Sequence, residues 1–452
     1  MEQGKIKKEV NKEFKVVGVS KVSIPSPFHP IIPYYVLMLE DKNGNRMPKK
    51  SMKEYKIGDE YLFSKGDVSI VKQKYDCYEA VKLALELIDD IVVNENSKIL
   101  IKPSIITATY PYLAVTTNPK VLAATLKILM EKGAKPENIT VAEQTPFMPI
   151  EISAKKSGIG SVCKKHGVKL MDLAKSEFEI KEGYEISREL FDKDIIINMP
   201  AMKTDSRFTI SGALENMTRC LSVNGQKKLF KDDIRKSRDV LNKLLPKELV
   251  IADAVLSMQG NGPLLGEPGF LNIVMASHDP VAIDEAFCRM ILADTPDYVK
   301  NTAGNHNPKI GGDELEACRY PLVKAEKGTT PHPDIKILGD SICPICYHSA
   351  ISAISKLVTS RGEKTYIAIG SEFGKEELSG KARLVALGDE AIGALERLGI
   401  EPSAKLSACP PDLVEQVVFI KKIFSSKLEK PKINIIDKAK SAVLKAALKF
   451  KK

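Results

Sequence analysis

The sequence predicts an α/β protein with a mostly parallel sheet core, a small N-terminal all-β barrel and a C-terminal α/β subdomain. Three observations support this fold class. Short strands separated by Gly, Asn and Pro turns occupy the start of the chain, as in small barrels. From Asp76 onward, apolar strands alternate with amphipathic helices, which is the pattern of crossover units. A second alternation of this kind begins near Pro333.

These shifts in pattern give the expected domain boundaries. Residues 1–70 form an OB-like β-barrel, residues 76–330 the α/β core, residues 331–425 a subdomain with a cysteine motif, and residues 426–452 a basic amphipathic tail. At roughly 150 residues per domain, a chain of 452 residues accommodates this division.

The composition is that of an ordinary globular protein, with 43% hydrophobic and 28% charged residues. It excludes wholesale disorder, collagen-like repeats and disulfide-dense mini-proteins. The formal net charge is +10, but eleven lysines and only two acids lie in residues 421–452. Since the rest of the chain is nearly neutral, the charge gives no argument for nucleic-acid binding.

The N-terminal region predicts short antiparallel strands. They are Phe14–Ser23, Tyr34–Glu40 and Tyr61–Phe63, separated by a Pro-rich turn at residues 25–33 and an Asn-Gly turn. The runs Pro33–Asp41 and Ile57–Glu60 resemble the OB-fold module of the domain of unknown function 35 family, without the cysteine pairs of its zinc ribbon. The resemblance implies the barrel alone.

The core and the C-terminal region each predict crossover units. In the core, the expected helices are Tyr78–Ile91 and Pro119–Glu131, and the expected strands are Ile99–Ile101, Ile139–Ala142, Asp194–Asn198, Leu249–Asp253 and Ile273–Ala276. In the C-terminal region, the expected strands are Ile335–Leu338, Tyr366–Ile369 and Leu384–Leu387, and the expected helices are Pro344–Val358, Ala391–Leu398 and Pro411–Phe424. Catalytic residues in such sheets gather beyond the carboxyl ends of the strands.

Six core motifs resemble, in order and spacing, the domain of unknown function 362 family. They are Leu100–Ser104, Thr117–Lys120, Ile196–Thr204, Ser211–Met217, Asp253–Pro268 and Ser277–Asp284. The resemblance implies an iron–sulfur association, because family members often carry ferredoxin modules, and it extends distantly to nickel-pincer lactate racemases. Glu215 stands where the family usually has Lys. If that Lys holds an anion, the site of this chain differs in charge.

Three cysteines carry the strongest chemical signal. Cys343 and Cys346 form a Cys-Pro-Ile-Cys motif at the start of a helix, and Cys409 precedes another helix. Helix N-termini stabilise thiolates and anionic clusters. We expect an iron–sulfur cluster of the 4Fe-4S kind on these cysteines, and the Cys-Pro-Pro stretch at Cys409 resembles the cluster-binding loop of hydrogenase small subunits. The candidate fourth ligands are Cys318, Cys220, His348 or a group from outside the protein.

Two alternatives for this motif stay open. Cys343, Cys346, His348 and Cys409 form a possible zinc ligand set, although His348 follows Cys346 by only two residues. The Cys-Pro-Ile-Cys motif is also typical of thioredoxin-like redox pairs.

Anion-binding residues are expected where the core strands end. Lys102 and Lys203 both end strands and enter loops, so either could hold a carboxylate or a phosphate. Gly260, Asn261 and Gly262 are expected to approach the ligand closely, and Asn216 is placed with them. The alternatives are a solvated lysine and a tight turn.

A divalent-cation site and a general base are further expectations. Glu143, Asp253 and Asp284 together could hold a cation. His278 could act as a base, whereas Asp279 with Pro280 predicts a helix N-cap.

The start of the chain is polar, and no run is long and apolar enough to span a membrane, so we expect a cytoplasmic protein. Ile433–Lys452 places apolar residues and lysines at helical spacing. This tail could bind an anionic membrane or a partner, or it could pack on the body. A redox partner is also expected.

The leading hypothesis is an iron–sulfur-dependent enzyme for an anionic small molecule, of oxidoreductase or lyase type. In it Lys102 and Lys203 bind the anion and the glycine loop closes over it. A non-enzymatic metal or cluster carrier and a zinc-stabilised binding module are the alternatives.

Overall fold

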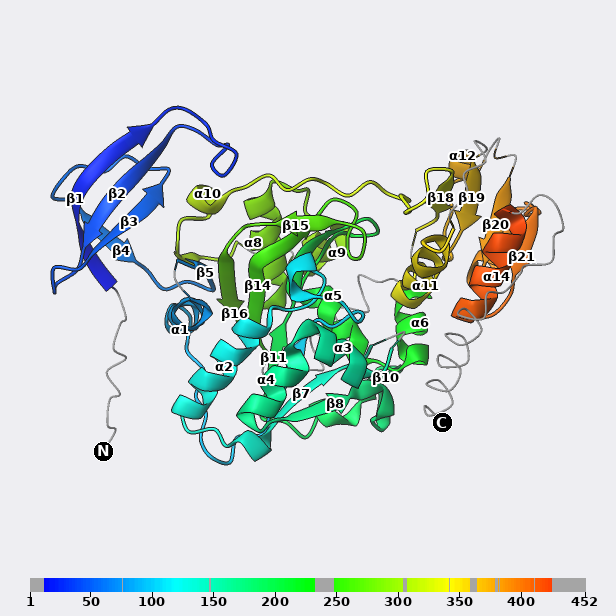
Figure 1. Ribbon diagram of the computed structural model, residues 1–452, viewed down its shortest axis with the longest axis horizontal. Helices are drawn as coiled ribbons and strands as arrows, with labels where there is room; N and C mark the ends of the chain where they lie inside the picture. Colours follow the sequence, from blue (N-terminus) through cyan, green and yellow to red (C-terminus); the bar gives the residue numbers. More distant parts are fainter. Residues whose placement is uncertain are drawn as a thin grey trace.

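The computed structural model describes residues 12–74, 76–145, 148–231, 248–303, 307–340, 342–357, 364–378, 381, 383–409 and 411–424. Three parts follow one another along the longest axis of the molecule (Figure 1). They are an N-terminal sheet, a central α/β part and a smaller C-terminal α/β part. The mixed α/β class predicted from the sequence is therefore confirmed. The basic tail predicted for residues 426–452 lies outside the described residues.

The N-terminal part is a four-stranded antiparallel sheet in the order β3-β2-β1-β4. Its strands are β1 (Lys12–Val22), β2 (Tyr34–Glu40), β3 (Arg46–Ser51) and β4 (Glu60–Phe63). Among the described residues, β3 pairs only with β2 and β4 only with β1, so the sheet is open and the closure into a barrel is not seen. Strand β3 was not predicted from the sequence, because its Pro and two Lys obscure the alternation of apolar and polar residues.

The central part is built on an eleven-stranded sheet with helices on both faces. Its strands are β5 (Val68–Lys72), β6 (Ile99–Pro103), β7 (Ile139–Glu143), β8 (Lys169–Asp172), β11 (Ile195–Met199), β12 (Ala201–Asp205), β13 (Thr209–Ser211), β14 (Glu248–Gln259), β15 (Glu267–Gly269), β16 (Ile273–Ser277) and β17 (Ile310–Gly312). Its helices are α1 (Cys77–Glu86), α2 (Pro119–Glu131), α3 (Ile150–Ser157), α4 (Ile159–His166), α5 (Ala213–Met217), α6 (Val223–Lys231), α8 (Pro280–Ile291), α9 (Asp297–Ala303) and α10 (Leu315–Cys318). A hairpin of β9 (Phe178–Lys181) and β10 (Tyr184–Ser187) lies apart from this sheet.

The main path of the sheet runs β17-β5-β16-β14-β11-β6-β7-β8. The strands from β14 to β8 are parallel, which confirms the predicted sheet type. In contrast, β16 is antiparallel to both β14 and β5. Strand β5 lies across the boundary expected at residue 70 and belongs to this sheet rather than to the N-terminal one.

Successive side chains of each central strand point to opposite faces of the sheet, so alternate residues pack into two different hydrophobic cores. On β6, Ile99 and Ile101 pack with α1, α2 and α4, whereas Leu100 packs on the other face with Met217 of α5. Lys102 shares the parity of Leu100 and therefore points to the face that α5 covers. The face to which Lys102 points is the face that carries the candidate site described below.

The C-terminal part is a four-stranded parallel sheet in the order β18-β19-β20-β21. Its strands are β18 (Ile335–Leu338), β19 (Thr365–Ala368), β20 (Leu384–Leu387) and β21 (Ala404–Leu406), and its helices are α11 (Pro344–Ile354), α12 (Lys375–Leu378), α13 (Asp389–Arg397) and α14 (Leu413–Phe424). Helices α11 and α14 share one hydrophobic core, and α13 packs on the other face. Among the described residues, no helix is long and apolar enough to cross a membrane.

Candidate functional site

A buried ion pair stands at the carboxyl end of β6. The Nζ of Lys102 lies 3.0 Å from Oε2 of Glu143, and both side chains are fully buried. The same Nζ donates to Oδ1 of Asn216 at 3.1 Å and to the carbonyl of Pro103 at 3.3 Å. These three acceptors match the three N–H groups of the ammonium. Lys102 therefore links the ends of β6 and β7 with α5. An incoming anion would have to displace Glu143, Asn216 or the carbonyl of Pro103 from its ammonium group.

Asn216, predicted to bind the anion, extends this buried network. Its amide donates to the carbonyl of Lys102 at 3.1 Å and to Oδ1 of Asn198 at 2.8 Å. Asn198 in turn donates to Oε1 of Glu248 at 2.7 Å. Burial raises the pKa of Glu248 to about 7, although the bond from Asn198 opposes the shift. The network thus contains a carboxyl group that titrates near neutral pH.

Lys203 is the second predicted lysine, and β12 buries it. Its Nζ donates to the carbonyl of Ala201 at 2.7 Å and lies 3.5 Å from Oγ of Ser104. Burial lowers its pKa to about 8, against the opposing effect of Glu215 and then Asp205. An ammonium group with this pKa exchanges its proton near physiological pH, as a general acid or base requires.

Two arginines, Arg207 and Arg219, lie near Lys203, and neither was predicted as a site residue. Arg207 forms a two-pronged contact with Asp205, with N–O distances of 3.1 and 2.7 Å, and lies 4.0 Å from Glu215. Glu215 therefore supplies a negative charge beside these cations. Among the described residues, Nη1 of Arg207 and Nη2 of Arg219 are buried without a hydrogen-bond partner. Both arginines lie just beyond the motifs Ile196–Thr204 and Ser211–Met217, and their position there was the sequence signal that could have identified them.

The three predicted cysteines converge. Cys343 is the N-cap of α11, Cys346 lies in its first turn, and Cys409 follows β21. The thiol of Cys346 hydrogen-bonds to both other sulfurs, which lowers the pKa of Cys343 and lowers that of Cys409 to about 7. The same bonds raise the pKa of Cys346. Cys343 and Cys409 are therefore more acidic than Cys346.

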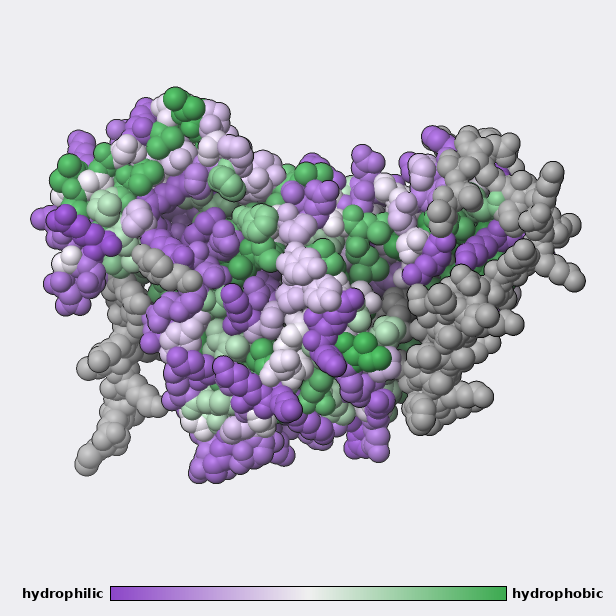
Figure 2. Space-filling model, in the orientation of Figure 1, coloured by the Kyte–Doolittle hydropathy of each residue, from purple (hydrophilic) through white to green (hydrophobic). Residues whose placement is uncertain are grey.

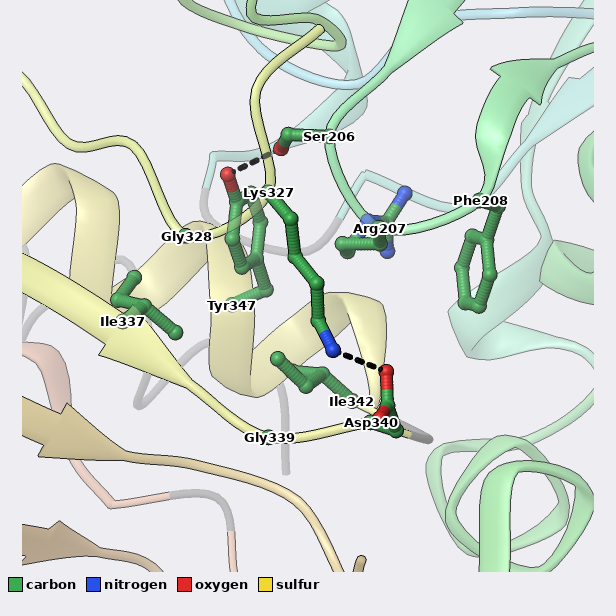
Figure 3. A pocket seen from close by; sticks show the side chains of 10 residues that line it. All are labelled: Ser206, Arg207, Phe208, Lys327, Gly328, Ile337, Gly339, Asp340, Ile342 and Tyr347. Carbon is green, nitrogen blue, oxygen red and sulfur yellow. Dashed lines mark hydrogen bonds and ion pairs between the residues drawn. The ribbon is translucent and has the colours of Figure 1, made fainter. Parts of the chain in front are cut away.

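The cysteine helix packs directly on the central site. The hydroxyl groups of Tyr347 and Ser206 lie 2.6 Å apart, and the guanidinium of Arg207 lies 5.3 Å from the centre of the Tyr347 ring (Figure 3). His348 is fully buried. Its pKa is well below the usual value because of burial and then because of three cations, Arg207, Arg219 and Lys203. The ring of His348 therefore belongs to the cationic cluster of the central part.

A small pocket opens at this junction, between the loop after β12 and the end of β18 (Figure 3). Its lining includes Arg207, Tyr347, Lys327 and Asp340, and the last two form an ion pair at 2.6 Å. Its volume of about 10 Å³ is close to that of a single water site. A larger ligand here requires the two parts to separate.

The other candidate fourth ligands lie away from the three sulfurs. Cys220 is buried beside the network, and its pKa is raised to about 12 by burial, with Lys102 and Glu143 as its charged neighbours. Burial also raises the pKa of Cys318 to about 12, and its first charged neighbour is Asp313. Neither thiol has the exposure or the low pKa of a reactive cysteine.

The predicted carboxylate cation site does not form. Glu143 pairs with Lys102. Asp253 accepts a bond from the backbone N–H at the N-cap of α2 at 2.6 Å, and Asp284 accepts bonds from the first two N–H groups of α5 at 2.6 and 3.1 Å. Each carboxylate thus holds a different piece of backbone. In the part of the chain that the structure describes, no group of three or more His, Cys, Asp and Glu side chains is placed to hold a metal ion.

His278, predicted as a general base, lies away from the lysines. Because β16 is antiparallel to β14, Ser277 stands opposite Val250, whereas Asp253 at the site stands opposite Val274. The chain therefore leads His278 away from the site, and its exposed Nε2 contacts the carbonyl of Asp89 at 2.7 Å. The neighbouring Asp279 caps α8, which confirms that prediction.

The glycine loop packs against the protein itself. The carbonyl of Gly262 accepts bonds from the N–H and the hydroxyl of Ser206 at 3.1 and 3.2 Å, and a Cβ on Gly262 would lie 2.0 Å from the carbonyl of Thr204. Asn261 accepts a bond from the N–H of Glu326 at 2.9 Å. Gly262 thus serves a close backbone contact, whereas Gly260 has open space around it and a φ of +75°. The anion-cradling role stays a prediction.

Comparison with known proteins supports the family resemblance for the central part. Residues 99–289 match the family model described as "Domain of unknown function (DUF362)". That segment holds both lysines and ends before the cysteine motif. The thylakoid-associated protein sll1697 of Synechocystis sp. is 24% identical over 204 residues, which are 42% of this chain and 62% of that protein. The match thus spans less than two thirds of the relative.

Among solved structures, this chain is similar to the lactate racemase apoprotein of Thermoanaerobacterium thermosaccharolyticum. The TM-score is 0.35 and the sequence identity 11%, with 90% of this chain and 96% of that chain covered.

Proposed function

We propose that this chain is an iron–sulfur protein that acts on a small anionic molecule at the junction of its central and C-terminal parts. One observation carries the proposal: Cys343, Cys346 and Cys409, from separate segments, meet beside a buried cluster of cations. Thiols that meet at the start of a helix are a chemically suitable ligand set for a cluster.

Three thiols are a donor set of the kind that binds iron or zinc, but among the described residues the structure places no such group in position to hold a metal ion. The thiols contact one another through Cys346, so a bound metal would replace those hydrogen bonds with metal–sulfur bonds. Among the described residues, His348 is the candidate fourth ligand nearest in sequence, and the charges that act on it are those of Arg207, Arg219 and Lys203. An iron–sulfur cluster bound through three cysteines would supply electron transfer, or a Lewis-acidic iron with an open position.

The residues of the central part have separate roles in this proposal. The buried N–H groups of Arg207 and Arg219 that lack partners among the described residues supply donors for a carboxylate or phosphate. Lys203 holds or releases a proton beside them. Lys102 keeps the strand ends in register through Glu143 and Asn216. Substrate entry requires the contact between Ser206 and Tyr347 to open.

The test is the metal content of protein purified without oxygen. We expect about four iron and four sulfide per chain and a broad absorbance near 400 nm. Cys409→Ala should lose the iron and the absorbance, whereas Cys77→Ala, a buried thiol of α1, should keep both. Zinc in place of iron would instead support a zinc-stabilised binding module. A colourless protein after attempted reconstitution would refute the cluster.

Lys203→Met separates an enzyme from a carrier. Lost turnover with retained iron supports the enzyme. Unchanged behaviour, with iron passed to a client protein, supports the carrier instead.

A further inference from the structure

A second recess lies far from the cysteines, where the N-terminal sheet meets the central part. Its volume is about 90 Å³. Strand β3 forms one wall, and the end of β5 with the segment after α10 forms the other. Figure 2 shows hydrophilic side chains in a hollow between the N-terminal sheet and the central part. This recess plays no part in the function proposed above.

Cations outnumber acids in this recess. Five lining residues are Lys or Arg, and Asp313 is the one Asp or Glu among them: the cations are Lys49, Lys50, Lys72, Lys74 and Arg319. Asp313 is already used, because it pairs with buried Lys49 and accepts a bond from the N–H of Lys72 at 2.9 Å. Its charge therefore balances chiefly one lysine. Arg319 pairs with Glu316 at 3.4 Å, which leaves Lys50, Lys72 and Lys74 without an ion pair among the described residues.

The lysines are held in place. The Nζ of Lys72 donates to the carbonyl of Leu271 at 2.7 Å, and that of Lys74 donates to the carbonyl of Pro48 across the junction. Lys50 stands 4.7 Å above the centre of the Tyr34 ring. Positioned ammonium groups lose little side-chain entropy when an anion arrives, so they bind it more tightly than mobile ones.

Placing these ammonium groups close together is unfavourable unless an anion balances their charge. Burial lowers the pKa of Lys50 and of Lys74, and neighbouring Lys72 and Lys49 lower them further. The pKa of His29 is lowered in the same way, by burial and then by Lys50. An anion in the recess would relieve this repulsion, and oxygen-rich phosphate groups are suited to lysine ammonium groups.

Two exposed aromatic rings complete the recess. Phe28 is 75% exposed and Phe270 is 63% exposed, yet both line the hollow with the lysines. A large exposed ring beside a cationic pocket offers an apolar face to a flat or aliphatic group. Charge and rings together indicate a ligand with a phosphate end and an apolar end.

We propose that this recess binds a phosphorylated small molecule, with its phosphate groups on Lys50, Lys72 and Lys74 and its apolar group against Phe28 and Phe270. The walls come from both the N-terminal sheet and the central part, so the ligand also joins these two parts. The recess volume of about 90 Å³ accommodates the phosphate end of the ligand, and the apolar group would lie against the exposed rings outside it.

Calorimetric titration of the full chain with ADP tests the proposal, with pyrophosphate and adenosine as partial ligands. We expect ADP to bind, adenosine to bind at least tenfold more weakly, and Lys50→Gln and Lys74→Gln each to weaken ADP binding roughly tenfold. Lys42→Gln is the matched control, because Lys42 is an exposed lysine of the same sheet outside the recess. Its affinity for ADP should stay within about twofold of the unaltered chain.

Each result decides a part of the proposal. Pyrophosphate binding as tightly as ADP would uphold the phosphate site and overturn the role of the rings. No binding of ADP or pyrophosphate, or an equal loss in Lys42→Gln, would overturn the site. A single-stranded oligonucleotide that binds more tightly than ADP would overturn the small-molecule class. Circular dichroism of each variant shows whether it folds, and in a folded variant ADP should raise the melting temperature less than in the unaltered chain.

Discussion

Glu143→Gln should destabilise the central part strongly, because it leaves the buried charge of Lys102 without a counter-charge. Both side chains are 0% exposed, and their charged atoms lie 3.0 Å apart. Removing one member of a buried pair typically costs about 3–5 kcal/mol. The two carboxylate oxygens accept from different backbone N–H groups, Oε1 from that of Ile105 and Oε2 from that of Gln144. Glutamine keeps one acceptor oxygen and replaces the other with an NH2 donor, so the expected loss combines the missing charge with one lost hydrogen bond.

The assay is urea unfolding followed by far-ultraviolet circular dichroism, since the chain has no Trp to report by fluorescence. We expect the free energy of unfolding to fall by about 3–5 kcal/mol. The control is Glu95→Gln, which breaks an exposed pair with Lys135 and should cost at most about 1 kcal/mol. The double variant Lys102→Met with Glu143→Gln should lose less than the sum of the two single losses. A loss in Glu143→Gln no greater than that in Glu95→Gln would refute the reasoning.

Three further predictions follow from other buried groups. Between pH 4.5 and 7 the folded state keeps the proton of Glu248 that the unfolded chain releases, so stability should fall with rising pH by up to roughly 3 kcal/mol; Glu248→Gln should flatten this part of a stability–pH curve. Between pH 8 and 10.5 Lys203 is deprotonated in the folded state and protonated in the unfolded chain. The free energy of unfolding should therefore rise with pH in this range by up to roughly 3 kcal/mol. A Lys203→Met variant that keeps the rise would count against the assignment to Lys203. Gly262→Ala places a Cβ 2.0 Å from the carbonyl of Thr204 and should cost about 1–3 kcal/mol in thermal unfolding, whereas Gly393→Ala, with nothing closer than 3.6 Å, should stabilise α13 by about 0.5–1 kcal/mol.

Local pattern predicted several elements of the α/β parts. The helix Pro119–Glu131 and the strands Ile335–Leu338 and Leu384–Leu387 have the predicted bounds, because their apolar runs, Pro starts and following glycines are local signals. Many other elements were not predicted, among them strands β3, β5, β8, β12 and β21 and helices α3 and α4. The pattern also gave no sign that β16 runs antiparallel to its neighbours. Strand direction is set by which strands pair, and that pairing involves residues distant in sequence.

The candidate site divides in the same way. Both lysines were predicted to end strands and enter loops. Lys102 lies near the carboxyl end of β6, whereas Lys203 lies within β12, which was not predicted, and both side chains are buried. What each lysine contacts was not predictable, because Glu143 and Asn216 reach Lys102 from separate segments. His278 does not lie with the lysines. It follows β16, and the antiparallel direction of β16 was not predicted from the sequence.

By itself, the sequence determined the α/β class, the order of the parts and the residue types able to bind metal or anions, because periodicity, caps and short motifs are local properties. The tertiary structure decided which of these residues meet. It brought Cys409 to Cys343 and Cys346, set Arg207 and His348 beside Lys203, and separated the three carboxylates. It also gathered lysines from β3 and β5 around one recess. The physical reason is that charge interactions and hydrogen bonds act over a few ångströms of space, whatever the separation of their partners along the chain.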